Sequence, residues 1–469
     1  MTRPLRLDPD RLLPLDPAAK LVARQLYETV ARLPILSPHG HTDPAWFATN
    51  EPFGNASDLL LRPDHYLLRM LHSQGISLEA LGVGAEADPR ESWRLFAANY
   101  HLFRGTPSRL WLDWAFVEVF GLAERLEAET SDLYFDRIGE RLADAAFRPR
   151  ALVDRFRIEL IATTDSPLDP LEHHQAIRAA NASGEWAGRV IPTYRPDPVV
   201  DLEHRDFLPN LKRFSELSGE DCSSWSGYLA AHRKQRARFI AMGATASDHG
   251  HPTAATADLT AARAASLFAR VAGGEAAPEE AALFRAQMLT EMARMSLDDG
   301  LVMQIHPGAW RNHNDKLFER FGPDKGADIP MRTGFTRELK PLLDLFGNEP
   351  RLTIILFTLD ESAYSRELAP LAGHYPALKL GPAWWFHDSP DGMRRFRRRV
   401  TETAGFYHGA GFNDDTRALL SIPARHDVAR RIDCSFLAEL VVDRQIEDWE
   451  AAELAIELAV VLARRAYRL

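Results

Sequence analysis

Two histidines separated by one glycine follow an apolar run near the amino end of the chain. The run covers residues 33–36, and the histidines are His39 and His41. Because side chains alternate along a strand, both imidazoles would project to the same face if the run is a strand. Two imidazoles on one face can supply half of a metal site. They can equally be histidines that hydrogen-bond to the backbone, so a metal site needs a carboxylate partner.

A carboxylate that could complete such a site lies near residue 415. The sequence there is Asp414-Asp415-Thr416-Arg417, at the end of a short run that begins at residue 411. In a closed barrel the last strand lies beside the first, which would bring Asp415 next to the two histidines. Alternatively, Asp414 and Asp415 are turn or N-cap residues before the helix that follows. Arg417 could pair with a substrate carboxylate or with an acid on the protein surface.

A histidine and a tyrosine share the first turn of a predicted helix. Residues 62–76 have the pattern of a helix that Asp64 caps and that stops near Gly75. His65 and Tyr66 would then lie at the helix N-terminus, where the helix dipole favours anions and lowers the proton affinity of a histidine. The pair could transfer protons to and from a substrate, or it could simply pack against a neighbouring helix.

Other apolar runs also end in residues that suit recognition of a polyhydroxylated anion. Arginine binds carboxylates, histidine and asparagine bind hydroxyls, and a tryptophan can face the apolar side of a sugar or merely fill the barrel. The candidates are Arg195, Asp248, His249, His306, Arg311, Asn312, Trp384 and Trp385.

These residues follow eight short apolar runs that alternate with helical stretches. Strands that alternate with helices indicate a parallel sheet, and eight repeats predict an α/β fold of the (β/α)₈ TIM-like barrel type. In such barrels the active site gathers at the carboxyl ends of the strands. The fourth and eighth runs have weak strand propensity. The runs are residues 33–41, 158–166, 189–195, 243–250, 301–308, 351–360, 377–385 and 411–417.

Uneven spacing between the runs locates helical insertions. We predict a single barrel domain over residues 1–469, with helical insertions at about 47–155, 207–238 and 254–297. The first insertion is rich in tryptophan, phenylalanine and leucine, which indicates a packed helical subdomain.

The composition narrows the class of protein. A net charge of -10 argues against a nucleic-acid surface, and two cysteines cannot build a disulfide framework. Neither a secretory signal nor a membrane span is evident, so we expect a cytoplasmic protein that uses a small-molecule substrate, with homo-oligomers possible. Nucleotide-binding, serine-hydrolase and H-E-x-x-H motifs are absent from the sequence.

Several ordered motifs resemble the uronate isomerase (glucuronate isomerase) family, a divergent branch of the amidohydrolase superfamily. The resemblance covers nearly the whole chain, and many matches in order are more specific than any one of them. The family's usual H-C-H appears here with Gly40 as the spacer, which leaves both ligands in place. The matching stretches are H-G-H, RPDHYLLRML, TTDSPLDPLEHH, VIPTYRPD, GATASDHG, MQIHPGAWRNHN, GPAWWFHDSPDGM and DDTRALLSIPARHDVARRI.

The resemblance implies a (β/α)₈ barrel with one divalent ion, often zinc, held by His39, His41 and Asp415. It implies interconversion of D-glucuronate with D-fructuronate, and of D-galacturonate with D-tagaturonate. The choice between Asp414 and Asp415, and between Trp384 and Trp385, depends on the alignment within short motifs. The positions that match the family's substrate and proton-transfer residues are His65, Tyr66, Arg195, His306, Trp385 and Arg417.

We hypothesise that Asp415 helps to open the sugar ring, that Tyr66 with His65 moves the C2 proton, and that Arg417 stabilises developing negative charge. One alternative is a metal-dependent hydrolase of the same superfamily that acts on a lactone or an amide. Two-metal hydrolases of this type use a bridging lysine at a strand end, and none of the eight runs ends in one. A second alternative is a sugar-acid binding protein without turnover, which would have lost these side chains.

Overall fold

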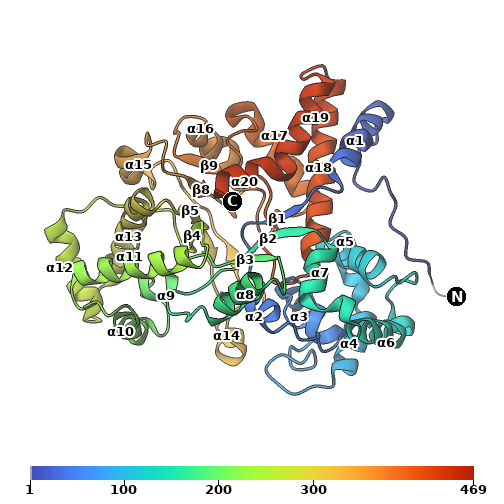
Figure 1. Ribbon diagram of the computed structural model, residues 1–469, viewed down its shortest axis with the longest axis horizontal. Helices are drawn as coiled ribbons and strands as arrows, with labels where there is room; N and C mark the ends of the chain where they lie inside the picture. Colours follow the sequence, from blue (N-terminus) through green and yellow to red (C-terminus); the bar gives the residue numbers. More distant parts are fainter. Residues whose placement is uncertain (1–2) are drawn as a thin grey trace.

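Seven parallel strands in two sheets form the centre of the molecule in a computed structural model that describes residues 3–469 (Figure 1). Most of their residues are buried, and about two thirds of them are apolar, as is typical of parallel sheets covered on both faces. One sheet has the order β1 (Ile35–Ser37), β2 (Ile158–Ala162), β3 (Arg189–Ile191); the other has β4 (Ala246–His249), β5 (Val302–Ile305), β8 (Ile354–Leu356), β9 (Leu378–Leu380).

Parallel bridges and backbone hydrogen bonds connect the two sheets into a ring. Tyr194, just after β3, bridges to Ser247 in β4, and Leu380 in β9 bridges to Gly409. The segment that follows Gly409 returns to β1, where the His41 amide donates to the Thr416 carbonyl at 2.9 Å. The predicted α/β barrel class is therefore confirmed, with residues 409–416 in the place of an eighth strand. A short antiparallel pair, β6 (Ala309–Trp310) and β7 (Ile329–Pro330), lies outside the ring.

Helices surround the ring, and many of them lie in the three regions of excess length. Figure 1 shows α4 to α7 gathered on one side of the strands and α10 to α13 on the other. The α-helices are α1 (Pro17–Val30), α2 (Pro44–Thr49), α3 (His65–Ser73), α4 (Pro89–Ala98), α5 (Pro107–Trp114), α6 (Ser131–Leu142), α7 (Pro149–Arg155), α8 (Glu172–Ser183), α9 (Asp197–Val200), α10 (Phe207–Ser218), α11 (Trp225–Ala241), α12 (Ala261–Ala272), α13 (Pro278–Asp299), α14 (Asp315–Phe321), α15 (Lys340–Phe346), α16 (Ala369–Ala372), α17 (Pro390–Ala404), α18 (Ser421–Val442), α19 (Asp448–Ile456) and α20 (Leu462–Tyr467).

Single turns of 3₁₀- or π-helix complete the helical content. They are η1 (Ser57–Leu61), η2 (Tyr100–Phe103), η3 (Ala115–Val119), η4 (Ala128–Thr130), η5 (Ala145–Phe147), η6 (Tyr364–Leu368) and η7 (Glu457–Val461). The division into one barrel domain with insertions at about 47–155, 207–238 and 254–297 stays a prediction.

The last run of the sequence pattern differs from a regular strand. Asp415 has a φ of 40°, in the left-handed region, which interrupts both extended and right-handed helical backbone. The next helix, α18, begins only at Ser421, so Asp414 and Asp415 are not its N-cap residues. By contrast, α3 begins as predicted, because the Asp64 side chain accepts hydrogen bonds from the amides of Tyr66 and Leu67.

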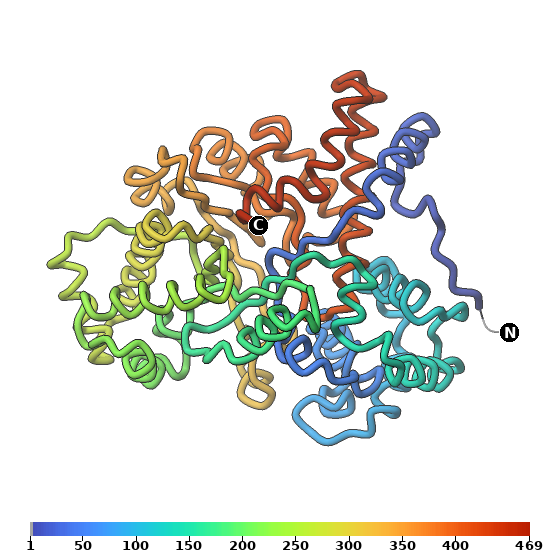
Figure 2. The backbone as a smooth tube through the Cα atoms, in the orientation of Figure 1, coloured from blue at the N-terminus to red at the C-terminus, as the bar shows by residue number. Residues whose placement is uncertain are grey.

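The two ends of the described chain pack against distant parts of the fold. Figure 2 shows the first helix, α1, beside the helices near the carboxyl end, and α1 packs on α18. Val460 and Ala463 form a small apolar cluster with strand residues such as Leu36, Leu160 and Ile191. None of the helices formed by residues 3–469 combines the length and apolar character needed to span a bilayer.

Candidate active site

A cavity of about 290 Å³ lies at the carboxyl ends of the strands, where the barrel pattern predicted the active site. It collects side chains that follow β1, β2, β3, β5 and β9, together with the start of α3 and residues 413–418. Most of the predicted site residues are present: the lining includes His39, His41, His65, Tyr66, Thr164, Arg195, His306, Arg311, Trp384, Trp385, Asp415 and Arg417.

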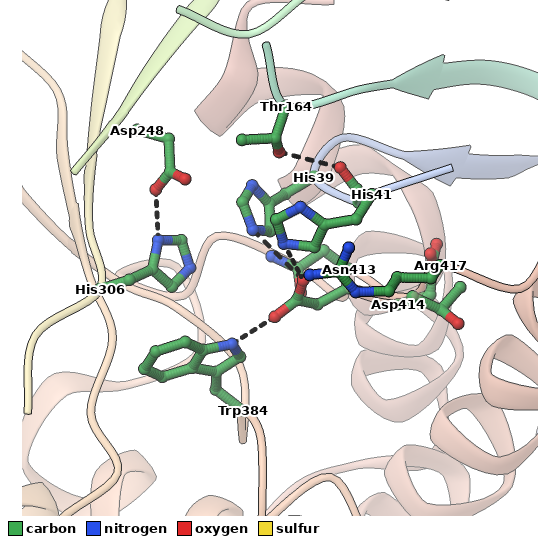
Figure 3. Close-up of polar contacts among 12 residues, drawn as sticks. His39, His41, Thr164, Asp248, His306, Trp384, Asn413, Asp414 and Arg417 are labelled. Atoms are coloured by element: carbon green, nitrogen blue, oxygen red, sulfur yellow. Dashed lines mark hydrogen bonds and ion pairs between the residues drawn. The ribbon is translucent and has the colours of Figure 1, made fainter. Parts of the chain in front are cut away.

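Three of these side chains form a compact group that could hold a metal ion. The Asp415 Oδ1 atom lies 3.1 Å from His41 Nε2 and 3.4 Å from His39 Nε2. One ligand atom from each residue falls within 4.8 Å of the others. Figure 3 shows the imidazoles of His39 and His41 beside each other after the end of β1. The segment that returns to β1 brings the Asp415 carboxylate to them. Of the two adjacent aspartates, Asp415 is therefore the one whose carboxylate lies between the two imidazoles.

The charges of this group suit a divalent cation. Burial favours a neutral carboxyl, but the two imidazoles outweigh it and hold the pKa of Asp415 well below its usual range. Burial also lowers the pKa of His41 to about 4, which leaves a neutral imidazole able to bind metal. Asp415 Oδ1 is buried and makes no hydrogen bond of good geometry. Two imidazoles and one carboxylate with a free oxygen fit an ion such as zinc.

A second group meets the same distance limit, but its carboxylate is already paired with protein donors. His39, Asp248 and His306 lie within 4.8 Å of one another by their ligand atoms. The Asp248 carboxylate, however, accepts a hydrogen bond at 2.6 Å from His306 Nδ1 and one at 3.0 Å from Arg195. Asp248 is not among the residues that line the cavity. Asp248 therefore lies outside the cavity lining and orients two side chains that do line it, Arg195 and His306.

The two tryptophans have different neighbours. Trp384 Nε1 donates a hydrogen bond to Asp415 Oδ2, which fixes the second carboxylate oxygen (Figure 3). Trp385 stacks on His65 with ring centroids 5.1 Å apart. Burial, with the positive charge of Arg417 nearby, lowers the pKa of His65 to about 3, so its imidazole is neutral at neutral pH.

The hydroxyl of Tyr66 hydrogen-bonds to the buried carboxylate of Asp388, which was not among the predicted site residues. Tyr66 donates to Asp388 Oδ2 at 2.7 Å, and Arg425 donates to the same oxygen at 2.7 Å. Burial and the Asp388 charge raise the pKa of Tyr66 well above its usual value. The other Asp388 oxygen, Oδ1, is buried without a partner. Both residues lie within stretches that match the family, GPAWWFHDSPDGM and DDTRALLSIPARHDVARRI, but nothing in the local sequence indicates that they meet at Tyr66.

Arg417 has a protein partner of its own in this structure. Its guanidinium pairs with Asp324 at 2.9 Å, and both side chains line the cavity. Burial raises the pKa of Asp324, but Arg417 outweighs it and lowers the value. Asp324 lies in a loop with no motif, so sequence reasoning missed it. Asn312, in contrast, does not line the cavity, and its backbone N–H donates to the Asp328 carboxylate.

Comparisons with known proteins agree with this geometry. A family model described as glucuronate isomerase matches residues 18–461. A uronate isomerase from Sphingopyxis alaskensis is 70% identical over 470 residues and covers 100% of both chains. The crystal structure of glucuronate isomerase from Caulobacter crescentus has a TM-score of 0.98 at 61% identity, covering 99% of this chain and 98% of that one. A uronate isomerase from Thermotoga maritima has a TM-score of 0.92 at 27% identity, covering 98% and 99%. The chain is therefore an isomerase that belongs to the uronate isomerase family.

Proposed function

We propose that this enzyme interconverts D-glucuronate with D-fructuronate and D-galacturonate with D-tagaturonate at a single divalent-metal site. The observation that carries the proposal is the cavity itself, which combines the His39, His41 and Asp415 group with the hydrogen-bonded pair of Tyr66 and Asp388. The names of the relatives support a uronate as the substrate. They do not favour the alternative of a lactone or amide hydrolase.

His39, His41 and Asp415 would hold the ion, and zinc is the metal we expect from this donor set. When bound, the ion would supply Lewis-acid polarisation of the substrate's oxygen atoms. Trp384 would keep the Asp415 carboxylate in its orientation through the indole hydrogen bond.

Ring opening is the first task for the chain's own residues. Removal of the C1 hydroxyl proton breaks the bond between C1 and the ring oxygen, and the ring oxygen takes up a proton. We assign Asp415 to the removal of that proton because its carboxylate lines the cavity and stays ionised. Arg417 and Arg195 also line the cavity and would attract the anionic substrate.

Isomerisation then moves one proton from C2 to C1. The C2–H bond gives its electron pair to an enediolate, O2 loses a proton, O1 gains one, and C1 is finally protonated, so no external oxidant is required. Tyr66 Oη would relay the proton, with Asp388 accepting the phenol proton through the existing 2.7 Å hydrogen bond. The neutral imidazole of His65, next to Tyr66, would act with it. Arg417 would stabilise the enediolate charge.

The test is turnover of the purified, zinc-loaded enzyme with each aldose in deuterated water, followed by proton NMR, with a chelated sample alongside. We expect both 2-keto acids to form and chelation to stop their formation. Asp415→Asn should also be inactive, while the surface variant Arg263→Gln should match the wild type. Absence of conversion in the metal-loaded wild type would contradict the proposal. A cytoplasmic location and a homo-oligomeric state stay predictions of the sequence.

A further inference from the structure

A second cavity, of about 530 Å³, lies at the opposite end of the barrel strands. Leu33 and Ile35 line it at the amino end of β1, whereas His39 and His41 line the active site beyond the carboxyl end of the same strand. Arg157, directly before β2, also lines it. Residues at the amino ends of barrel strands ordinarily serve stability, so a polar cavity there calls for another explanation.

The lining of this basic cavity is rich in arginine. Five arginines face two carboxylic acids, Glu118 and Asp427, in a chain whose overall net charge is -10. The arginines come from the amino-terminal segment, from the end of α7 and the turn after it, and from α18: they are Arg11, Arg155, Arg157, Arg430 and Arg431.

One of the two acids, Asp427, is already neutralised within the protein. Asp427 accepts hydrogen bonds from Arg11 at 2.6 Å and from Arg431 at 3.1 Å, and Tyr27 donates to it as well. Arg155 donates to the backbone carbonyl of Glu118 rather than to its carboxylate. Three arginines of the lining, Arg155, Arg157 and Arg430, therefore have no carboxylate partner among the described residues, and the single unpaired carboxylate of Glu118 leaves the lining with a net positive charge.

Arg430 and Arg431 are the two buried members of the set, and only Arg431 pairs with a described carboxylate, that of Asp427. Arg430 is 6% exposed, its two terminal nitrogens donate to the carbonyls of Ala31 and Pro34, and its Nε is buried with no hydrogen-bond partner. Burial, assisted by the nearby Arg157 charge, lowers the pKa of Arg430 to about 10 against the opposing effect of Asp427. A guanidinium that is desolvated and lacks a carboxylate is unfavourable unless an anion binds beside it.

We propose that the basic cavity binds a phosphate group, either free phosphate or the phosphate of a small ester. A dianionic phosphate has more negative charge and more acceptor oxygens than a single carboxylate, and arginine forks match its geometry. The apolar side chains of Trp114, Phe156 and Leu33 in the same lining would accommodate the organic part of an ester. This site is separate from the proposed isomerase chemistry and does not depend on it.

Isothermal titration of the full-length, zinc-loaded protein tests the site, with inorganic phosphate, glucose 6-phosphate and D-glucuronate as separate probes. We expect saturable binding of phosphate, and tighter binding of the ester if the apolar lining contributes. Arg157→Gln, at an exposed position, should weaken phosphate binding by about tenfold. Arg430→Lys keeps the charge but removes Nε and the fork, and should weaken it similarly.

Two controls separate this cavity from other places where phosphate could bind. Arg263→Gln, an exposed arginine on α12 at the far side of the molecule in Figure 1, should leave the affinity unchanged. Asp415→Asn should also bind phosphate normally, whatever its activity. The proposal is overturned if phosphate does not bind, if Arg157→Gln binds as well as the wild type, if binding disappears with Asp415→Asn, or if glucuronate binds at this cavity in preference to both phosphates.

Discussion

At the scale of single residues, the hydrogen bond from Tyr66 to Asp388 is the contact to which we assign the transfer of the C2 proton. Tyr66→Phe removes the hydroxyl and leaves the packing of the ring intact, so kcat should fall by about 10²- to 10⁴-fold while metal content is unchanged. Tyr364→Phe is a matched control, because the Tyr364 hydroxyl is buried without a partner. Steady-state kinetics with metal analysis checks this, and full turnover by Tyr66→Phe would remove the assigned role.

The backbone at Gly40, between His39 and His41, does not need the conformational freedom of a glycine, because its φ is not in the left-handed region. A Cβ built there would meet only ordinary contacts, 3.5 Å from the Thr416 carbonyl and 3.6 Å from Asp414 Oδ1. We expect Gly40→Ala to keep metal binding and to raise stability by about 0.4–1 kcal/mol, because alanine restricts the unfolded chain. Urea unfolding measures the effect. Gly308→Ala should destabilise instead, since Gly308 has a φ of 92° and its Cβ would lie 2.2 Å from Thr333 Oγ1.

At the scale of elements, the cap of α3 positions the two residues to which we assign proton transfer, His65 and Tyr66. The Asp64 carboxylate accepts from the Tyr66 amide at 2.8 Å and so fixes the turn that carries His65 and Tyr66. Asp64→Ala should cost about 1 kcal/mol of stability and lower kcat, whereas Asp64→Asn should retain most of both, because asparagine also caps helices. Thermal unfolding and steady-state kinetics on the two variants test this prediction. If Asp64→Ala and Asp64→Asn have equal kcat values, the cap does not position His65 and Tyr66 for catalysis.

A second contact between elements, made by Glu367, should make the stability of the protein depend on pH, and it does not involve the candidate metal ligands. Glu367, in η6, accepts hydrogen bonds from the amides of Phe335 at 2.6 Å and Thr336 at 2.8 Å. Burial opposes ionisation, but these amides and Arg366 outweigh it and lower the pKa of Glu367 to about 2. Its contribution to stability is therefore present above the unfolded pKa, near 4.5, and is lost as the pH falls toward 2.

Glu367→Gln should accordingly reduce stability by about 2 kcal/mol at neutral pH, and the difference from the wild type should shrink below pH ~4.5. Urea unfolding at a series of pH values measures it. A difference that is constant with pH would show that the charge of Glu367 does not matter. Glu319→Gln, on the exposed face of α14, serves as the control.

At the scale of the whole molecule, the proposed ion would join the first and last segments of the barrel. His39 and His41 follow β1, and Asp415 lies on the segment that closes the ring. Metal removal should therefore lower the thermal unfolding temperature as well as activity, with a stabilisation of about 2.7 kcal/mol at a metal concentration a hundred times the Kd. Calorimetry with and without chelator measures this. Asp415→Asn should unfold at a temperature that chelation no longer changes.

The sequence predicted the barrel because each strand run is short, apolar and followed by reactive residues. Those signals are local, and they located seven strands, the metal-binding candidates and the cap at Asp64. The eighth run was predicted to be a weak strand, but its left-handed backbone at Asp415 could not be predicted, since that φ depends on contacts with β1 rather than on neighbours in sequence. Asp388 was missed for a similar reason, because its partner Tyr66 is 322 residues away.

One helix contributes to both cavities. Arg425 of α18 lines the active-site cavity, while Arg430 and Arg431, which follow Arg425 on the same helix by less than two turns, line the basic cavity. Any coupling of the two ligands through this helix obeys thermodynamic linkage and is therefore reciprocal. Whatever factor an occupant of the basic cavity imposes on the affinity for uronate, uronate must impose the same factor on that occupant. The strength of the coupling can thus be measured as the change in phosphate affinity that uronate causes, without a measurement of enzyme activity.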